Sequence, residues 1–251
     1  MFDLAKVLSL TDEDTVYKMG FDFTSDEQRK VLEYLQKNNY QLIAYKGAAG
    51  PQQVDAGLPT WFSVPFGNMF GEVTIDYTPL YKVYVFNRAE IAANTVIQMQ
   101  SLSSEIGLGT ALNFEQNGSF TSAGSSNPGT ITLHSKRPAG TPAVTVGLAG
   151  LVNLPSGTAY LPFCAFTLTP MGSITMTPKE QVAIMAAQVD LESGNVQANA
   201  AAPGASLVFD ASRIDYSLMI KDSTYEITNV PGTTSVTPIT SGQSLSYLNK
   251  K

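Results

Sequence analysis

From Tyr40 onward the chain consists of short apolar or alternating runs, rich in Thr, Val, Ile, Tyr and Phe and separated by Gly, Pro, Asn and Ser. Such runs are typical of strands, and turn signals about 8 to 12 residues apart are typical of sandwiches and barrels. Long helices do not alternate with the strands, which argues against a doubly wound α/β fold. The pattern predicts an all-β sandwich, as one unit or as two packed or tandem halves.

Strands are expected at 40–46, 60–66, 71–77, 80–87, 94–102, 110–115, 118–123, 129–135, 143–151, 158–168, 172–177, 180–188, 205–210, 214–220 and 223–228. The small, polar segment 189–204 is expected to be a long connection or an edge strand. The segment 230–251 is expected to hold a last extended strand that ends near Leu248.

One segment predicts a helix clearly. Ser25 is a good N-cap with Gln28 as its capping-box partner, and an apolar stripe follows at Val31, Leu32 and Leu35. The helix should end near 38–39, and a second short helix is expected at 2–10. The expected organisation is therefore a helical N-terminal appendage, 1–39, and a β-sandwich domain, 40–251.

Two turns are expected to close hairpins. Asn117-Gly118 favours a type I′ turn, which would bring Phe114 and Phe120 together across the hairpin. Thr167-Leu168-Thr169-Pro170 is echoed by Thr175-Met176-Thr177-Pro178, which predicts a second hairpin around 171–172.

Charged side chains are scarce, at 14% of the chain, and there is one His and one Cys. One chain therefore cannot supply a Cys/His zinc site, a CxxC redox pair or a disulfide framework. The net charge of −6 argues against sequence-independent nucleic-acid binding. No apolar run is long enough for a membrane span, and no signal peptide is evident. We expect synthesis in the cytoplasm, with later release from the cell compatible with the sequence.

Candidate catalytic groups are few. Cys164 lies in an apolar run and His134 on the polar face of a predicted strand, so a nucleophilic Cys–His pair is disfavoured. Carboxylates remain the one catalytic option that scarcity leaves open, as a glycosidase-like pair or an oxygen-lined calcium site. The sets are Asp190 with Glu192, Asp210 with Asp215, and Asp55 with Glu72 and Asp76.

Aromatic side chains are concentrated in 60–86, which contains the only Trp. Amphipathic rings near glycine and proline turns suit stacking on sugars or contact with lipid headgroups, and they equally suit a sandwich core. The site hypothesis is a contact surface that comprises Trp61, Phe66, Phe70 and Tyr81.

The segment Phe62-Ser63-Val64-Pro65-Phe66 resembles the Phe-Ser-Val-Pro-Tyr segment of the actinoporin cytolysins. Those proteins are β-sandwiches that bind sphingomyelin through exposed aromatics. The likeness covers five residues, and this chain is longer, acidic and without a dense tryptophan patch. The resemblance implies a membrane-lipid ligand, but it assigns no binding residue in this chain.

The preferred function is therefore a non-enzymatic binding protein of lectin or cytolysin (toxin) type. It would recognise a glycan or membrane lipid through aromatic side chains, without metal or cofactor. The first alternative is a structural or self-assembling protein, and a homo-oligomer is expected. The second alternative is a carboxylate-dependent hydrolase.

Overall fold

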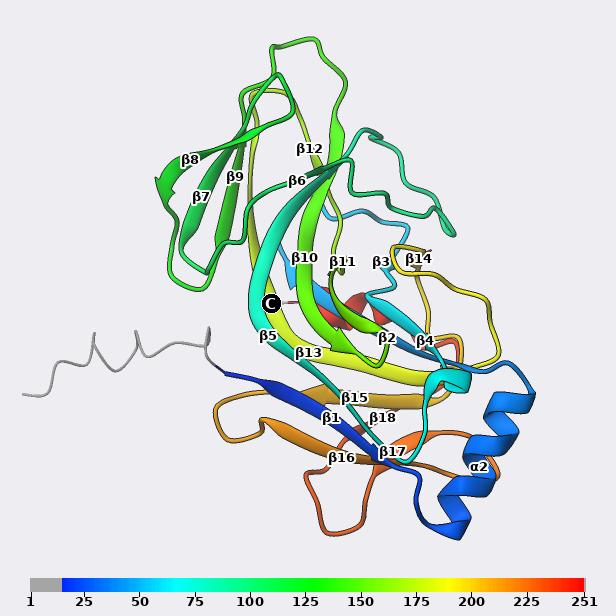
Figure 1. The fold of residues 1–251 in the computed structure, drawn as a ribbon. Coiled ribbons are helices and arrows are strands. Elements are labelled where there is room, and N and C mark those ends of the chain that lie inside the picture. Colours follow the sequence, from blue (N-terminus) through cyan, green and yellow to red (C-terminus); the bar gives the residue numbers. More distant parts are fainter. Residues whose placement is uncertain (1–14, 251) are drawn as a thin grey trace, which may run out of the picture.

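The computed structural model describes residues 15–250 of the chain. Two large mixed sheets pack face to face, which confirms the predicted all-β sandwich (Figure 1). The helix expected at 2–10 lies outside the described residues.

The first sheet has β1 near its middle. Its strands, in spatial order, are β11 (Gly157–Pro162), β10 (Val144–Leu154), β5 (Glu72–Phe86), β1 (Tyr17–Asp22), β16 (Asp215–Ile220) and β17 (Ile227–Asn229). Two short strands join it, β12 (Phe166–Leu168) against β10 and β6 (Ser101–Leu102) against β5.

The second sheet is built around β13. Its order is β18 (Thr237–Ile239), β15 (Gly204–Val208), β13 (Ser173–Ala187), β9 (Ile131–Ser135), β7 (Thr110–Phe114) and β8 (Phe120–Ser125). The strand β2 (Gln41–Ala49) pairs with β13 and with β4 (Phe62–Pro65). A separate pair consists of β3 (Leu58–Pro59) and β14 (Val196–Gln197), so the segment 189–204 is a connection with one short strand.

The predicted helix is confirmed as α2 (Asp26–Lys37). The Ser25 side chain accepts a hydrogen bond from the Gln28 amide at 3.2 Å, and the predicted apolar stripe is buried. In contrast, 15–39 is not a purely helical appendage. The preceding residues form β1, which pairs with β5 on one side and β16 on the other, because every second residue, Tyr17, Met19 and Phe21, is apolar and faces the core.

Four predicted strands form only two. The ranges 71–77 and 80–87 join into β5, and 172–177 and 180–188 join into β13, each 15 residues long and visibly curved in Figure 1. Each long strand carries a bulge beside a proline. In β5 the residues around Pro79 lie opposite Leu151, and in β13 the three residues after Pro178 lie opposite Gly47. Proline lacks the N–H that a regular ladder needs, and a bulge tolerates this loss.

Both predicted turns exist, but neither has the predicted form. Phe114 and Phe120 do pair, with ring centroids 5.4 Å apart. In that turn Gly118 has a positive φ of 85° and Asn117 does not, so it is not the type I′ turn, which needs positive φ at both central residues. The turn at 169–172 does not close a hairpin, because β12 pairs with β10 in one sheet and β13 pairs within the other.

The strands predicted at 110–115, 129–135, 143–151 and 214–220 are confirmed as β7, β9, β10 and β16, and other predictions fail in part. The range 94–102 contains only the two-residue β6, and 158–168 is divided into β11 and β12. The tail forms β18 and then a 3-10 helix, η3 (Leu245–Asn249), instead of a strand that runs to Leu248.

Candidate functional site

The structure places most of the predicted contact surface in the core. Trp61 and Phe66 are fully buried and Tyr81 is 1% exposed, so these three side chains form no contact surface. The physical reason is packing between the sheets: the Trp61 ring meets Tyr77 edge-on at 5.1 Å and Phe62 at 5.2 Å. Trp61 precedes β4 and Phe66 begins a 3-10 helix after it, so both rings turn into the core at the two ends of that short strand, where strand alternation does not apply.

Phe70 is the exception, since 70% of it is exposed. It lines a hollow of about 500 Å³ beside α2, together with Phe23, Leu32 and Arg29. Phe70 is therefore the one exposed ring of the four in the predicted contact surface, because the other three are buried in the core.

A different group of aromatic rings lies at the surface. The rings of three tyrosines lie close together, with centroids 4.7 to 6.2 Å apart. We name Tyr34, Tyr40 and Tyr225 the tyrosine cluster. The Tyr34 and Tyr225 rings are nearly parallel, with an interplanar angle of 6°, and Tyr34 is 44% exposed. Tyr40 and Tyr225 are partly buried against the core, so the group presents mainly Tyr34 to solvent, at a place that the sequence did not predict.

Three separate elements position these rings. Tyr34 lies on α2 outside its buried stripe, and Tyr40 lies three residues after the helix ends at Lys37. Tyr225 lies in the turn from β16 to β17, where its amide donates to the Lys221 carbonyl at 3.0 Å. Its φ is +54°, which is uncommon for an aromatic residue and costs energy. Such backbone strain is concentrated at functional sites, although it does not by itself identify one.

Two hollows adjoin the tyrosine cluster, and residues 188–189 line both of them. The first, of about 290 Å³, includes Tyr40 and Tyr225, and the second, of about 310 Å³, includes Asn39, Gln188 and Asp190. Among the described residues, the side chains of these last three residues make no hydrogen bond to the protein and are exposed to solvent. Two amides and one carboxylate are therefore available to a ligand beside the rings.

The possible catalytic groups have other partners. His134 Nδ1 lies 2.8 Å from the Ser173 hydroxyl, whereas the buried Cys164 sulfur accepts from the Leu148 amide at 3.3 Å. The two side chains form no nucleophile–base pair within residues 15–250.

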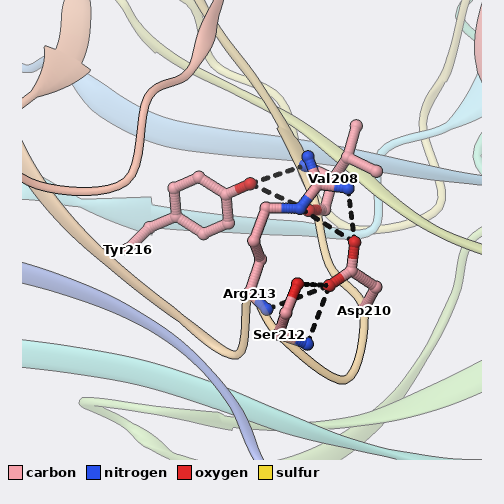
Figure 2. Close-up of polar contacts among 5 residues, drawn as sticks. All are labelled: Val208, Asp210, Ser212, Arg213 and Tyr216. Carbon is pink, nitrogen blue, oxygen red and sulfur yellow. Dashed lines mark hydrogen bonds and ion pairs between the residues drawn. The ribbon is translucent and has the colours of Figure 1, made fainter.

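Two of the candidate carboxylates, Asp210 and Asp76, are hydrogen-bonded to other side chains. Figure 2 shows Asp210 bound by the Ser212 hydroxyl at 2.7 Å and by the Arg213 guanidinium, with Nε at 2.8 Å. These hydrogen bonds, that of Arg213 first, lower the pKa of Asp210. Beside this turn, the Tyr216 hydroxyl of β16 donates to the Val208 carbonyl of β15 at 2.8 Å, so these contacts link β15 to β16.

Asp76 is also engaged, as it accepts from the Asn153 amide at 2.6 Å. Within the described part of the chain, no three His, Cys, Asp or Glu side chains gather so that they could hold a metal ion. The carboxylate hypothesis thus gains no support from the geometry.

The sequence carried little signal for the tyrosine cluster, because Tyr225 is far along the chain from Tyr34 and Tyr40. The only available sign was Tyr34, an aromatic residue at a helix position outside the apolar stripe 31, 32 and 35.

The chain matches no known protein family, no curated protein and no solved structure. No helix among residues 15–250 is long and apolar enough to cross a membrane.

Proposed function

We propose that the protein is a non-enzymatic binding protein of lectin type that recognises a glycan at the tyrosine cluster. The observation that carries this proposal is a group of three tyrosine rings, of which Tyr34 is exposed and the other two are partly buried, beside hollows with unpaired amide and carboxylate groups.

Both kinds of group match the chemistry of a sugar. The C–H face of a sugar ring packs on a flat aromatic face, and a tyrosine adds a hydroxyl that hydrogen-bonds. The Asn39 and Gln188 amides offer donors and acceptors, and the Asp190 carboxylate accepts from sugar hydroxyls. Three rings from separate elements are already in place, so binding orders few side chains.

Charge favours a glycan over a lipid surface. The chain has a net charge of −6, and Asp190 lies at the edge of the site. Lys221, the lysine in the Tyr225 turn, is paired with Glu226 at 2.8 Å. Lys30 and Lys37 lie near Tyr34 on α2 and make no ion pair within the described residues, but two lysines fall short of the clusters of about four to eight that anionic membranes attract.

A glycan array with the labelled protein tests the proposal, followed by calorimetry on the glycans that bind. Tyr34→Ala and Gln188→Ala should each weaken binding by about tenfold or more, which corresponds to about 1.4 kcal/mol. Both side chains are exposed, so the fold should be retained, as circular dichroism would show.

Phe70→Ala is the matched control, because it removes an exposed ring at another place and should leave the affinity unchanged. Absence of binding to any glycan overturns the proposal. So does binding to phosphatidylcholine or sphingomyelin vesicles without glycan binding, which would favour the lipid reading. Loss of binding in Phe70→Ala alone would move the site to the hollow beside α2.

The expected homo-oligomer stays a prediction. Light scattering on the same samples measures it, and several linked sites would raise the avidity of a lectin without any new contact.

A further inference from the structure

One ion pair lies inside the sandwich. Lys46 of β2 is the only charged side chain among the described residues that is classed with the buried core, at 1% exposure, and its ammonium group contacts Glu180 of β13. The Lys46 nitrogen is 4.5 Å from the centre of the Tyr77 ring and 5.8 Å from those of Trp61 and Phe163. Removing two charges from water is expensive, so a buried pair is weak evidence for a purely stabilising role.

The two bulges converge on this pair. The bulge in β13 comprises residues 179–181 and therefore includes Glu180, and Tyr77 and Tyr81 flank the bulge in β5. Bulges redirect side chains and are frequent beside active sites. Here they bring groups from both sheets to one carboxyl group.

The carboxyl group of Glu180 receives three donors. The Tyr77 hydroxyl donates to Oε2 at 2.8 Å, and the Tyr81 hydroxyl donates to Oε1 at 2.7 Å. The Lys46 ammonium also donates to Oε2. An amine thus lies against a carboxyl group whose two oxygens are held by fixed phenols, the arrangement of an acyl-transfer site with donors for the developing oxyanion.

We propose that Lys46 and Glu180 condense to an isopeptide bond that links β2 to β13. The contact seen in the structure is the ion-paired precursor of that bond.

The reaction balances without a co-reactant. The Lys46 ammonium first passes a proton to Oε2, which gives an amine and a carboxylic acid. The amine nitrogen attacks Cδ, and Tyr81 donates a hydrogen bond to the negative charge that develops on Oε1. The nitrogen passes its extra proton directly to the departing Oε2, with which it is already in contact, and the Tyr77 hydroxyl donates a hydrogen bond to the same oxygen. A C–N bond forms, a C–O bond breaks, and one water molecule leaves.

The surroundings favour the neutral product. Burial lowers the pKa of Lys46, against the opposing effect of Glu180, and so favours the amine that attacks. Burial would raise the pKa of Glu180, but the Lys46 charge and the three hydrogen-bond donors outweigh it and lower that pKa, so the initial proton transfer to Oε2 is the costly step. The amide replaces two buried charges with a neutral group. The Glu180 side chain is 22% exposed, which gives the released water a route to solvent.

Intact mass spectrometry of the purified, denatured protein tests whether the isopeptide bond has formed. The wild-type chain should be lighter than its sequence mass by one water, about 18 Da, and a protease digest should contain a branched peptide that joins the Lys46 and Glu180 segments. A mass equal to the sequence mass overturns the proposal, and this readout does not depend on any variant.

Variants identify the bond. Lys46→Met should have its full sequence mass, whereas Glu180→Gln should lose ammonia, about 17 Da, because its amide releases nitrogen instead of oxygen. Tyr81→Phe should lower the linked fraction at early times. The matched control is Lys221→Met, which removes a lysine from the exposed Lys221–Glu226 pair and should keep the loss of water.

Loss of water that persists in Lys46→Met, or a branched peptide at other residues, would contradict the assignment. If Lys46→Met fails to fold, the wild-type digest still identifies the two linked residues.

Discussion

At the residue scale, Cys164 shows how burial silences a reactive group. Its thiol is enclosed in the core, and the loss of surrounding water raises the pKa of Cys164 to about 12. The thiolate is the nucleophilic form of cysteine, so a thiol with so high a pKa is nearly all protonated at neutral pH.

Iodoacetamide should therefore label Cys164 only after unfolding. We expect no modified thiol in the native protein at pH 7 to 8 within an hour, and one per chain in denaturant, as counted by mass spectrometry. Rapid labelling of the native protein would show that Cys164 is accessible. Cys164→Ala is the blank for modification elsewhere.

The aromatic residues show what a pattern at this scale leaves open. Trp61, Phe66 and Phe70 lie within ten residues in similar apolar surroundings, yet only Phe70 is exposed. Core packing and ligand contact both use large aromatic side chains, so the residue types in this segment are compatible with either role. The sequence could supply the candidates but not choose between them.

At the element scale, α2 was predictable because its signals are local. The cap, the acidic first turn and the apolar stripe all lie within about a dozen residues. The long strands were not, since Pro79 and Pro178 look like breaks. They are absorbed by bulges whose partner strands lie elsewhere in the sequence.

Ser25→Ala should cost about 1 kcal/mol of unfolding free energy, because the Gln28 amide loses its acceptor. Urea unfolding followed by circular dichroism measures the cost. Ser223→Ala is the control, as this exposed serine makes no side-chain hydrogen bond within the described residues and should leave the midpoint unchanged. Equal midpoints for the two variants would show that the cap contributes nothing.

At the scale of the whole molecule, residues 15–39 belong to the sandwich. β1 is hydrogen-bonded on both sides, and the core includes Met19, Phe21, Leu32 and Leu35 from this segment. A strand inserted between two others cannot be removed without exposing two edges and their apolar face.

A chain that begins at residue 40 should therefore not fold independently. We expect it to lack the cooperative urea transition of the full chain and to bind a hydrophobic dye, because β5 and β16 lose the strand between them. A sharp transition at the wild-type midpoint would restore the boundary expected between 39 and 40.

The sequence by itself determined the all-β class, most strand positions, α2 with its cap, and the poverty of side-chain chemistry. These follow from short-range periodicity and composition, which do not depend on distant partners. Only the tertiary structure decided which rings are buried and which three tyrosines meet in the tyrosine cluster. It alone placed Lys46 against Glu180, 134 residues away. The physical reason is that strand pairing and sheet packing set these neighbours, and both join segments that are remote in the chain.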